Sequence, residues 1–213
     1  MTISLKNKQQ APRQRASGDT ASTILDIAER LAQTKGYNGF SYADIAEELG
    51  VTKASLHYHF PSKAELGRAL ITRYESVFGA ALEEIDRQAV KPLEKLRRYV
   101  GLYDGVMRND RMCLCGMLAA EYATLPASMQ AELRRFFDLN ERWLTNVLVP
   151  GRQSGEFVFK ESENERARLI LSSLEGAMLV ARSYGDPRRF QTAAEYVLED
   201  LSAAKQSRSA KRA

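Results

Sequence analysis

The chain has 213 residues, of which 44% are hydrophobic and 27% charged, which excludes an intrinsically disordered protein. Its formal net charge of +4 is compatible with a nucleic-acid partner without requiring one. Its first residues are polar and basic, which does not fit a signal peptide, and no stretch approaches the ~18 apolar residues of a membrane span, so we expect a cytoplasmic protein.

Both ends of the chain are basic. Residues 1–18 contain four Lys or Arg residues before the first acidic residue, Asp19, and residues 205–213 contain four more without an acid. Both segments are also polar, so we expect them to be mobile arms. Such arms either contact DNA phosphates or only keep the chain in solution, and the sequence leaves both readings open.

Almost every segment between these arms repeats its apolar residues with the period of an α-helix. The first helix carries an apolar face from Ile24 to Leu31 and is expected to end near Gly36, a residue suited to a helix C-terminus. Short helices are expected over residues 41–49 and 52–59.

Longer helices are expected beyond Phe60. They are a long helix after Pro61, one from Pro92, one over 111–123, one from Pro126 to Pro150, and two around 170–181 and 190–201. The stretch 151–160 is expected to be a loop. With about nine helices and no alternating strand pattern, the predicted fold class is all-α.

The stretch Ser41–Phe60, SYADIAEELGVTKASLHYHF, fits a helix-turn-helix. Two short helices that cross at a steep angle need a small residue at their contact and a glycine in the turn, and Ala46 and Gly50 occupy these positions. The Thr52 hydroxyl can cap the second helix. That helix then offers small and polar side chains to a major groove.

The run from Ile24 to Leu70 resembles the DNA-binding domain of the TetR family of transcription regulators. The matching features are the first amphipathic helix, Gly36 before Phe40, Ser41, Ala43-Asp44-Ile45-Ala46, Gly50-Val51, and Tyr58-His59-Phe60 followed by Ser62-Lys63. The helical remainder also resembles the ligand-binding and dimerisation domain of the family. The resemblance implies a DNA-binding domain over 19–66 and a ligand-binding and dimerisation domain over 67–204.

Carried over position by position, the resemblance also implies the DNA contacts. The expected phosphate contacts are Ser41, Thr52, Tyr58 and Lys63. The expected base-reading residues are Lys53, Ala54, Ser55 and His57. Tyr58 and His59 either contact DNA or pack the recognition helix against the first helix, and Lys63 either contacts a phosphate or only caps or solvates a helix start. The family usually has Tyr or Trp where this chain has His57; imidazole can still donate to a phosphate, and its charge depends on pH, so the role of this position stays open.

One recognition helix covers only a few base pairs, so we expect a homodimer on a palindromic operator. The last two helices are the candidate interface, because they combine small residues with apolar ones. These residues are Ser172, Ser173, Gly176, Ala177, Leu174, Met178, Val197 and Leu201. The alternative is that both helices belong to the internal core.

A small-molecule effector of unknown identity is expected to bind among the middle helices. The candidate lining residues are Tyr103, Met107, Cys113, Met117, Phe137, Trp143 and Tyr184. Aromatic and Met side chains also form ordinary cores, so that reading stays open for each of them. Effector binding is expected to tilt the long helix after Pro61 and so change the spacing of the recognition helices.

The segment Cys113-Leu114-Cys115-Gly116, followed by Glu121, is similar to a branch of the family with Gly-Cys before a helix and Glu eight residues later. Some members of that branch sense oxidants or electrophiles, which implies Cys113 or Cys115 as a candidate sensor, although Met112 replaces the glycine. The alternative is that both are inert buried residues. Two thiols without a nearby His make a poor zinc site, so we expect no metal and no cofactor.

The sequence therefore predicts a ligand-responsive repressor that is released from its operator by an effector or by cysteine modification. We expect no enzyme activity, because the chain lacks a phosphate-binding glycine loop and a nucleophile elbow, and its only histidines lie in the recognition helix. The alternative function is an all-α small-molecule carrier that does not bind DNA. Activation in place of repression also stays open.

Overall fold

The computed structural model describes residues 17–201, which form nine α-helices and one short 3-10 helix. This confirms the all-α fold. Most of the arm predicted over 1–18 and the whole of the tail predicted over 205–213 lie outside the described residues. None of the helices within 17–201 combines the length and apolar character needed to cross a bilayer.

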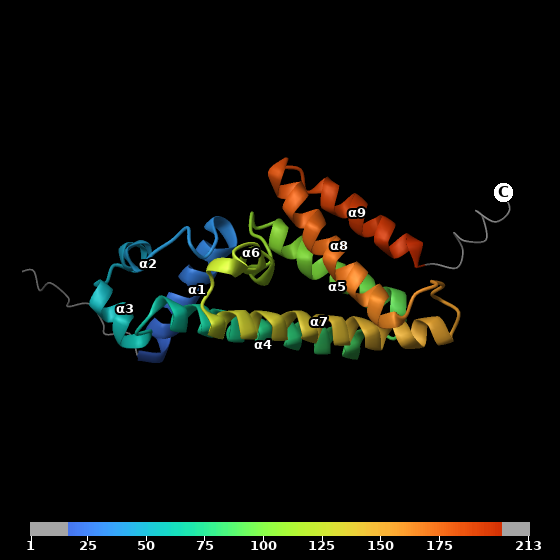
Figure 1. The fold of residues 1–213 in the computed structure, drawn as a ribbon, viewed down its shortest axis with the longest axis horizontal. Helices are drawn as coiled ribbons and strands as arrows, with labels where there is room; N and C mark the ends of the chain where they lie inside the picture. The colour runs from blue at the N-terminus through green and yellow to red at the C-terminus, as the bar shows by residue number, and fades with distance from the viewer. Residues whose placement is uncertain (1–16, 202–213) are drawn as a thin grey trace, which may run out of the picture.

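Three helices form a head at one end of the molecule: α1 (Ser17–Lys35), α2 (Tyr42–Leu49) and α3 (Lys53–His59) (Figure 1). Helix α1 stops because Gly36 adopts a φ of 85°, and α2 stops at Gly50 with a φ of 71°. Both values lie in the left-handed region that glycine tolerates best. The predicted ends of these two helices are therefore confirmed.

The head has its own apolar core. Ile24, Ala28, Ile45, Leu56 and Leu66 are completely buried and come from α1, α2, α3 and the start of α4. Burying each of the larger side chains contributes roughly 1.5–3 kcal/mol, which fixes the short α2 and α3 helices that would not be stable alone.

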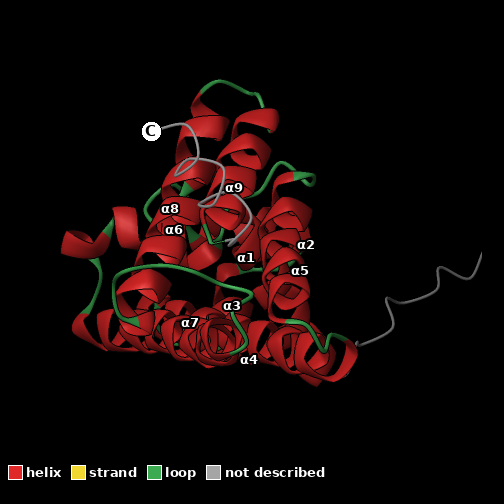
Figure 2. Cartoon of the chain, turned by 90° about the vertical axis from the view of Figure 1, so that its right-hand side faces the viewer, coloured by secondary structure: helices red, strands yellow, loops and turns green. Residues whose placement is uncertain are grey.

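The larger domain is built on two long helices, α4 (Lys63–Gln88) and α7 (Ala127–Gln153), which run side by side (Figures 1 and 2). Against them pack α5 (Pro92–Met107), α6 (Leu114–Ala120) and α8 (Glu163–Ser183), and α9 (Arg188–Asp200) packs on α8 and α5. Helix α4 is shared, since its first turns pack in the head and its middle lies in the larger core.

Two helices differ from the sequence-based expectation. The helix predicted over 111–123 is only α6, followed by the 3-10 helix Tyr122–Thr124. Its expected first turn is pulled away because the Met112 N–H donates to the Gln33 carbonyl of α1 at 3.3 Å. Helix α7 runs past Pro150, where it was predicted to end, and the Ser154 N–H closes its last turn on the Pro150 carbonyl at 3.0 Å.

Candidate DNA-binding head and sensor core

The outward face of α3 carries the predicted base-reading residues. Lys53, Ala54 and His57 are exposed. Tyr58 is 80% exposed, more than any other tyrosine of the described residues. Leu56, on the opposite face, is completely buried and holds α3 on the head. The outward face is therefore small and polar enough to approach the edges of base pairs in a major groove.

Two predicted phosphate contacts lie at helix starts. The Ser41 hydroxyl donates to Asp44 at 2.7 Å and accepts the Ala43 N–H, which completes a capping box at α2. The hydrogen bonds from Ser41 lower the pKa of the Asp44 carboxyl. The Thr52 hydroxyl accepts the Ser55 N–H at 3.3 Å and caps α3 as predicted. Both hydroxyls remain exposed.

His57 is anchored on the head through one ring nitrogen. Its Nδ1 lies 3.1 Å from the Pro61 carbonyl, which can only accept, so this nitrogen carries the proton. The ring lies 4.7 Å from the ring of Tyr42, whose hydroxyl donates to the Phe60 carbonyl at 2.7 Å. Burial raises the pKa of Tyr42 to about 12, which keeps it a donor. His57 therefore orients the end of α3 and leaves only Nε2 for another partner.

Tyr58 and His59 differ in their surroundings. Tyr58 projects from the head, whereas His59 is half-buried, with its ring edge-to-face on Tyr58 at 5.2 Å between centroids. Of the two readings left open for His59, partial packing on the head is therefore the one that its burial favours.

Lys63, which was expected to contact a phosphate, has internal partners in this structure. Its ammonium donates to the carbonyl oxygens of Tyr37, at 2.6 Å, and Phe40. It also lies about 4.5 Å over the Phe40 ring and 4.6 Å over the Tyr37 ring. Burial lowers the pKa of Lys63, while the carboxylates of Glu121 and Asp44 act in the opposite direction. Lys63 thus secures the loop between α1 and α2.

Glu121 holds the same loop from the other side. Its carboxylate accepts the Tyr37 N–H at 2.6 Å and the Asn38 N–H at 3.2 Å, so the end of α6 is tied to the head. A Cβ at Gly36 would lie 2.9 Å from Glu121 Oε1, so the turn needs glycine for space as well as for its φ. The sequence pattern pointed to Glu121 but gave no partner for it.

The larger domain contains a continuous aromatic core in which seven rings contact one another. They are Tyr74, Phe78, Tyr99, Tyr103, Phe136, Trp143 and Phe190. The core also contains a short hydrogen-bonded chain. The Tyr99 hydroxyl donates to the Asn140 amide oxygen at 2.8 Å and lies 3.1 Å from the Tyr103 hydroxyl. Polar groups inside an apolar core give it hydrogen-bonding specificity.

Glu175 of α8 is half-buried, with its carboxylate enclosed beside this core. Neither of its carboxylate oxygens is reached by solvent or makes a well-formed hydrogen bond with the described residues. Burial raises its pKa from 4.5 to about 7, and the facing Cys113 thiol and Tyr103 hydroxyl offset only part of that effect. A buried carboxyl without firm partners is costly, which distinguishes Glu175 from an ordinary core residue.

Cys113 and Cys115 are both free and buried, with exposures of 2% and 0%. Burial is the main cause that raises the pKa of each thiol, and the neighbouring Glu175 acts in the same direction. A thiol held in its protonated form is a weak nucleophile. In this conformation both cysteines have the environment of inert core residues.

The candidate effector residues are only partly brought together. Tyr103 and Cys113 meet at Glu175, and Trp143 stacks on Tyr99 at 5.3 Å. Met117 and Phe137 border the core, and Met107 lies at its outer end. Tyr184 lies apart from the other candidates, since it is 65% exposed and its ring stacks on the Arg189 guanidinium at 3.7 Å. It follows the end of α8, outside the aromatic core.

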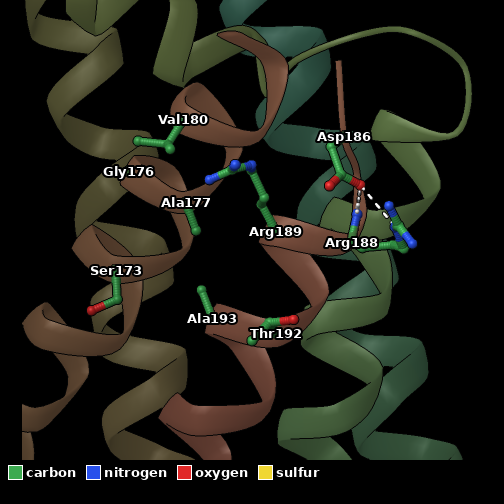
Figure 3. Close-up of a pocket in the computed structure, with 9 residues that line it drawn as sticks. All are labelled: Ser173, Gly176, Ala177, Val180, Asp186, Arg188, Arg189, Thr192 and Ala193. Carbon is green, nitrogen blue, oxygen red and sulfur yellow. Dashed lines mark hydrogen bonds and ion pairs between the residues drawn. The ribbon is translucent and has the colours of Figure 1, made fainter. Parts of the chain in front are cut away.

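The outer surfaces of α8 and α9 form an open groove. Small side chains line it from both helices, as Figure 3 shows for Ser173, Gly176, Ala177, Thr192 and Ala193. The exposed apolar residues Leu169, Leu179, Val180 and Tyr196 lie on the same two helices. Leu174, Met178 and Leu201, predicted to supply interface area, are instead completely buried within the protomer.

Two family models match the chain. The one described as bacterial regulatory proteins, tetR family, matches residues 24–70, and the one described as tetracyclin repressor-like, C-terminal domain, matches residues 92–197. The first coincides with the head and the start of α4, and the second with most of the larger domain.

Individual proteins agree with these matches. The chain is 27% identical to the transcriptional regulator AcuR of Cereibacter sphaeroides over 84% of this chain and 85% of that protein. It is 30% identical to the HTH-type transcriptional regulator LmrA of Bacillus subtilis over 77% and 87%. A solved transcriptional regulator of the TetR family from Agrobacterium tumefaciens is 35% identical and superposes with a TM-score of 0.86 over 88% of this chain and 100% of that one.

Proposed function

The chain belongs to the TetR family of bacterial regulatory proteins, and on that premise we propose that it is a ligand-responsive repressor that binds a palindromic operator as a homodimer in the cytoplasm. The observation that carries the DNA-binding part is the outward face of α3. Lys53 and Tyr58 project from it beside small residues, while Leu56 fixes its inner face. An all-α carrier would have no use for this arrangement.

The proposed DNA contacts follow from these positions. Lys53, Ala54, Ser55 and Tyr58 approach the major groove, and Ser41 and Thr52 bring the capped starts of α2 and α3 to the backbone. His57 contributes through its Nε2 atom. Lys63 supports the DNA-binding face indirectly, because its hydrogen bond to Tyr37 keeps the loop between α1 and α2 in place.

The proposed dimer interface is the groove side of α8 and α9. Small residues along α8 allow another helix to approach closely, and exposed apolar residues beside them supply buried area on association. A two-fold axis through this face would carry the two heads together, so that both α3 helices meet successive turns of one side of a duplex.

The proposed effector site is the polar-aromatic core around Glu175, Tyr103 and Cys113. A hydrogen-bond donor on the effector would give the Glu175 carboxyl the partner it lacks. Because Glu175 Oε2 lies almost where a Cβ on Gly116 would stand, α6 and α8 approach closely here, and we propose that binding displaces α6 from α8. Glu121 then transmits the movement of α6 to the head, together with the tilt of α4.

Cysteine modification is the second route of release. Since both thiols are buried and their pKa values are raised, a reagent would have to enter the same core before it could react. The measurement is operator release after alkylation of the wild-type chain and of the Cys113→Ser and Cys115→Ser variants. Loss of release in one variant would support this route, and an unchanged response in both would end it.

The function is tested by selecting duplexes from a random pool with the purified chain, followed by sedimentation of the complex. We expect an inverted repeat with half-sites about 10 bp apart, bound by two copies of the chain. If no duplex is enriched at low ionic strength, the carrier is the better reading. An enriched site without dyad symmetry would refute the dimeric binding mode alone.

A further inference from the structure

A pocket of about 280 Å³ lies in the larger domain, and two of its residues, Met112 and Arg182, donate hydrogen bonds to the end of α1. Its walls come from the end of α5, the segment before α6, and the turn between α8 and α9. Met107, Met112, Ala181 and Pro187 make one side of it apolar. The volume is near the lower end of the range of roughly 300–1,000 Å³ for small-molecule sites. Glu175, Tyr103 and Cys113 are not among the residues that line it.

The other side of the pocket carries guanidinium groups that lack an acidic partner. The Arg111 side chain is half-buried and makes no hydrogen bond or ion pair with the described residues. Arg182 donates only to neutral carbonyl oxygens. Asp186 is already paired with Arg188 at 3.1 Å, so the charge of Asp110 alone opposes two positive charges. The pocket is left with one positive charge in excess.

We infer that this pocket is a second effector site that binds a small monocarboxylate, with the carboxylate between Arg111 and Arg182 and the apolar part against the methionines. Guanidinium and carboxylate form short, charge-assisted hydrogen bonds that are about twice as strong as neutral ones. A phosphate offers similar acceptors, but its second charge is repelled by the unpaired Asp110.

The same arginine connects the pocket to the DNA-binding head. Arg182 Nη1 donates to the Gln33 carbonyl at 3.0 Å, and Nη2 donates to the Thr34 carbonyl, both in the last turn of α1. Met112, another wall residue, donates its N–H to Gln33. A carboxylate in the pocket competes with these carbonyls for Arg182 and offers the stronger acceptor. Occupancy therefore loosens the end of α1, directly before the loop held by Glu121 and Lys63.

The test measures binding of sodium propionate and sodium benzoate to the full chain by calorimetry, without DNA and at constant ionic strength. Propionamide and benzamide are the neutral controls, and inorganic phosphate is the second anion. We expect at least one carboxylate to bind saturably at millimolar concentration and at least about tenfold more tightly than its amide and than phosphate. Arg111→Gln and Arg182→Gln should each weaken that binding by about tenfold or more.

Arg142→Gln is the matched control, because Arg142 is exposed on α7 outside the pocket and should leave binding unchanged. If Arg182→Gln disturbs folding, Arg111→Gln still tests the assignment, since the Arg111 side chain makes no hydrogen bond or ion pair with the head. Equal binding of acid and amide, wild-type affinity in Arg111→Gln, or no saturable carboxylate binding would each overturn the site. Tighter binding of phosphate would overturn the monocarboxylate assignment.

Carboxylate binding to this pocket does not depend on the proposed function; only its expected effect on DNA binding rests on it. If a carboxylate binds and no duplex does, the repressor proposal fails and the pocket stands. If the chain binds its operator and no carboxylate, the pocket fails and the repressor stands.

Discussion

The Glu121 carboxylate accepts the Tyr37 N–H at 2.6 Å, across 84 residues of sequence, and thereby joins the end of α6 to the DNA-binding head. Lys63 of α4 holds the carbonyl of the same residue. The loop between α1 and α2 is thus bound through its amide groups by Glu121 of the larger domain, and through its carbonyl groups by Lys63 of α4. A movement of α6 relative to α4 would therefore be felt by this loop.

Replacing Glu121 should weaken the head. In Glu121→Ala the Tyr37 and Asn38 amides lose their acceptor, so we expect the free energy of unfolding to fall by roughly 1–3 kcal/mol in urea titrations. Hydrogen exchange of the Tyr37 amide should accelerate as well. Glu83→Ala is the control, since Glu83 is exposed on α4 and should change stability by less than about 0.5 kcal/mol. Equal effects of the two substitutions would contradict the tie between α6 and the head.

Lys53 and Lys63 should separate into a DNA contact and an internal contact. Lys53→Ala should lower the slope of log affinity against log salt concentration by about one, as expected for a lost phosphate contact. Lys63→Met should leave that slope unchanged, because the ammonium is occupied by two carbonyls, and should lower the free energy of unfolding by roughly 1–3 kcal/mol. Operator titrations at several salt concentrations measure both slopes. A slope lowered equally by both substitutions would return Lys63 to the DNA interface.

The helical framework was predictable because local residues determine it. Gly36 and Gly50 take the left-handed backbone that ends a helix, and Thr52 caps the next one, so the head follows from residues close in sequence. The internal role of Lys63 was not predictable. Its carbonyl acceptors lie more than 20 residues away, and an exposed lysine that contacts phosphate has the same sequence pattern.

It was harder to tell from the sequence which residues of the helices in the larger domain are buried and which are exposed. Met178 and Tyr184 both continue the apolar pattern of α8, yet Met178 is completely buried and Tyr184 is 65% exposed. Periodicity gives the face of a helix but not which partner covers it. Pro150 was read as a helix end, but α7 continues for three more residues because the Ser154 N–H closes the last turn.

Stability should depend on pH through Glu175. Its pKa is about 7 in the folded protein and near 4.5 when unfolded, so between these values the folded state holds the extra proton. The free energy of unfolding should therefore fall as pH rises from about 4.5 to 7 and level off above that range. Glu175→Gln, which cannot ionise, should match the wild type at low pH and be more stable by up to about 3 kcal/mol at pH 8.

Urea titrations across this pH range measure the effect of Glu175, and Glu83→Gln supplies the control for an exposed carboxyl. A constant difference between Glu175→Gln and the wild type at every pH would mean that the carboxyl titrates normally. The proposed effector site would then lose the unsatisfied group on which it is based.

Gly176 offers a test of the dimer that spares the fold. A Cβ at this position would meet no atom within 4 Å, so Gly176→Leu fits the isolated protomer and should gain slightly in helix propensity. The same side chain would project into the groove between α8 and α9, where a second copy is proposed to pack closely. We therefore expect sedimentation to show dissociation to monomers, and operator affinity to fall by at least about a hundredfold because paired half-site contacts are lost.

The control is Ala80→Leu, on an exposed turn of α4, which should remain dimeric and bind normally. If Gly176→Leu also stays dimeric, the two-fold axis has to be placed on another face, since no close helix approach at Gly176 would admit a leucine.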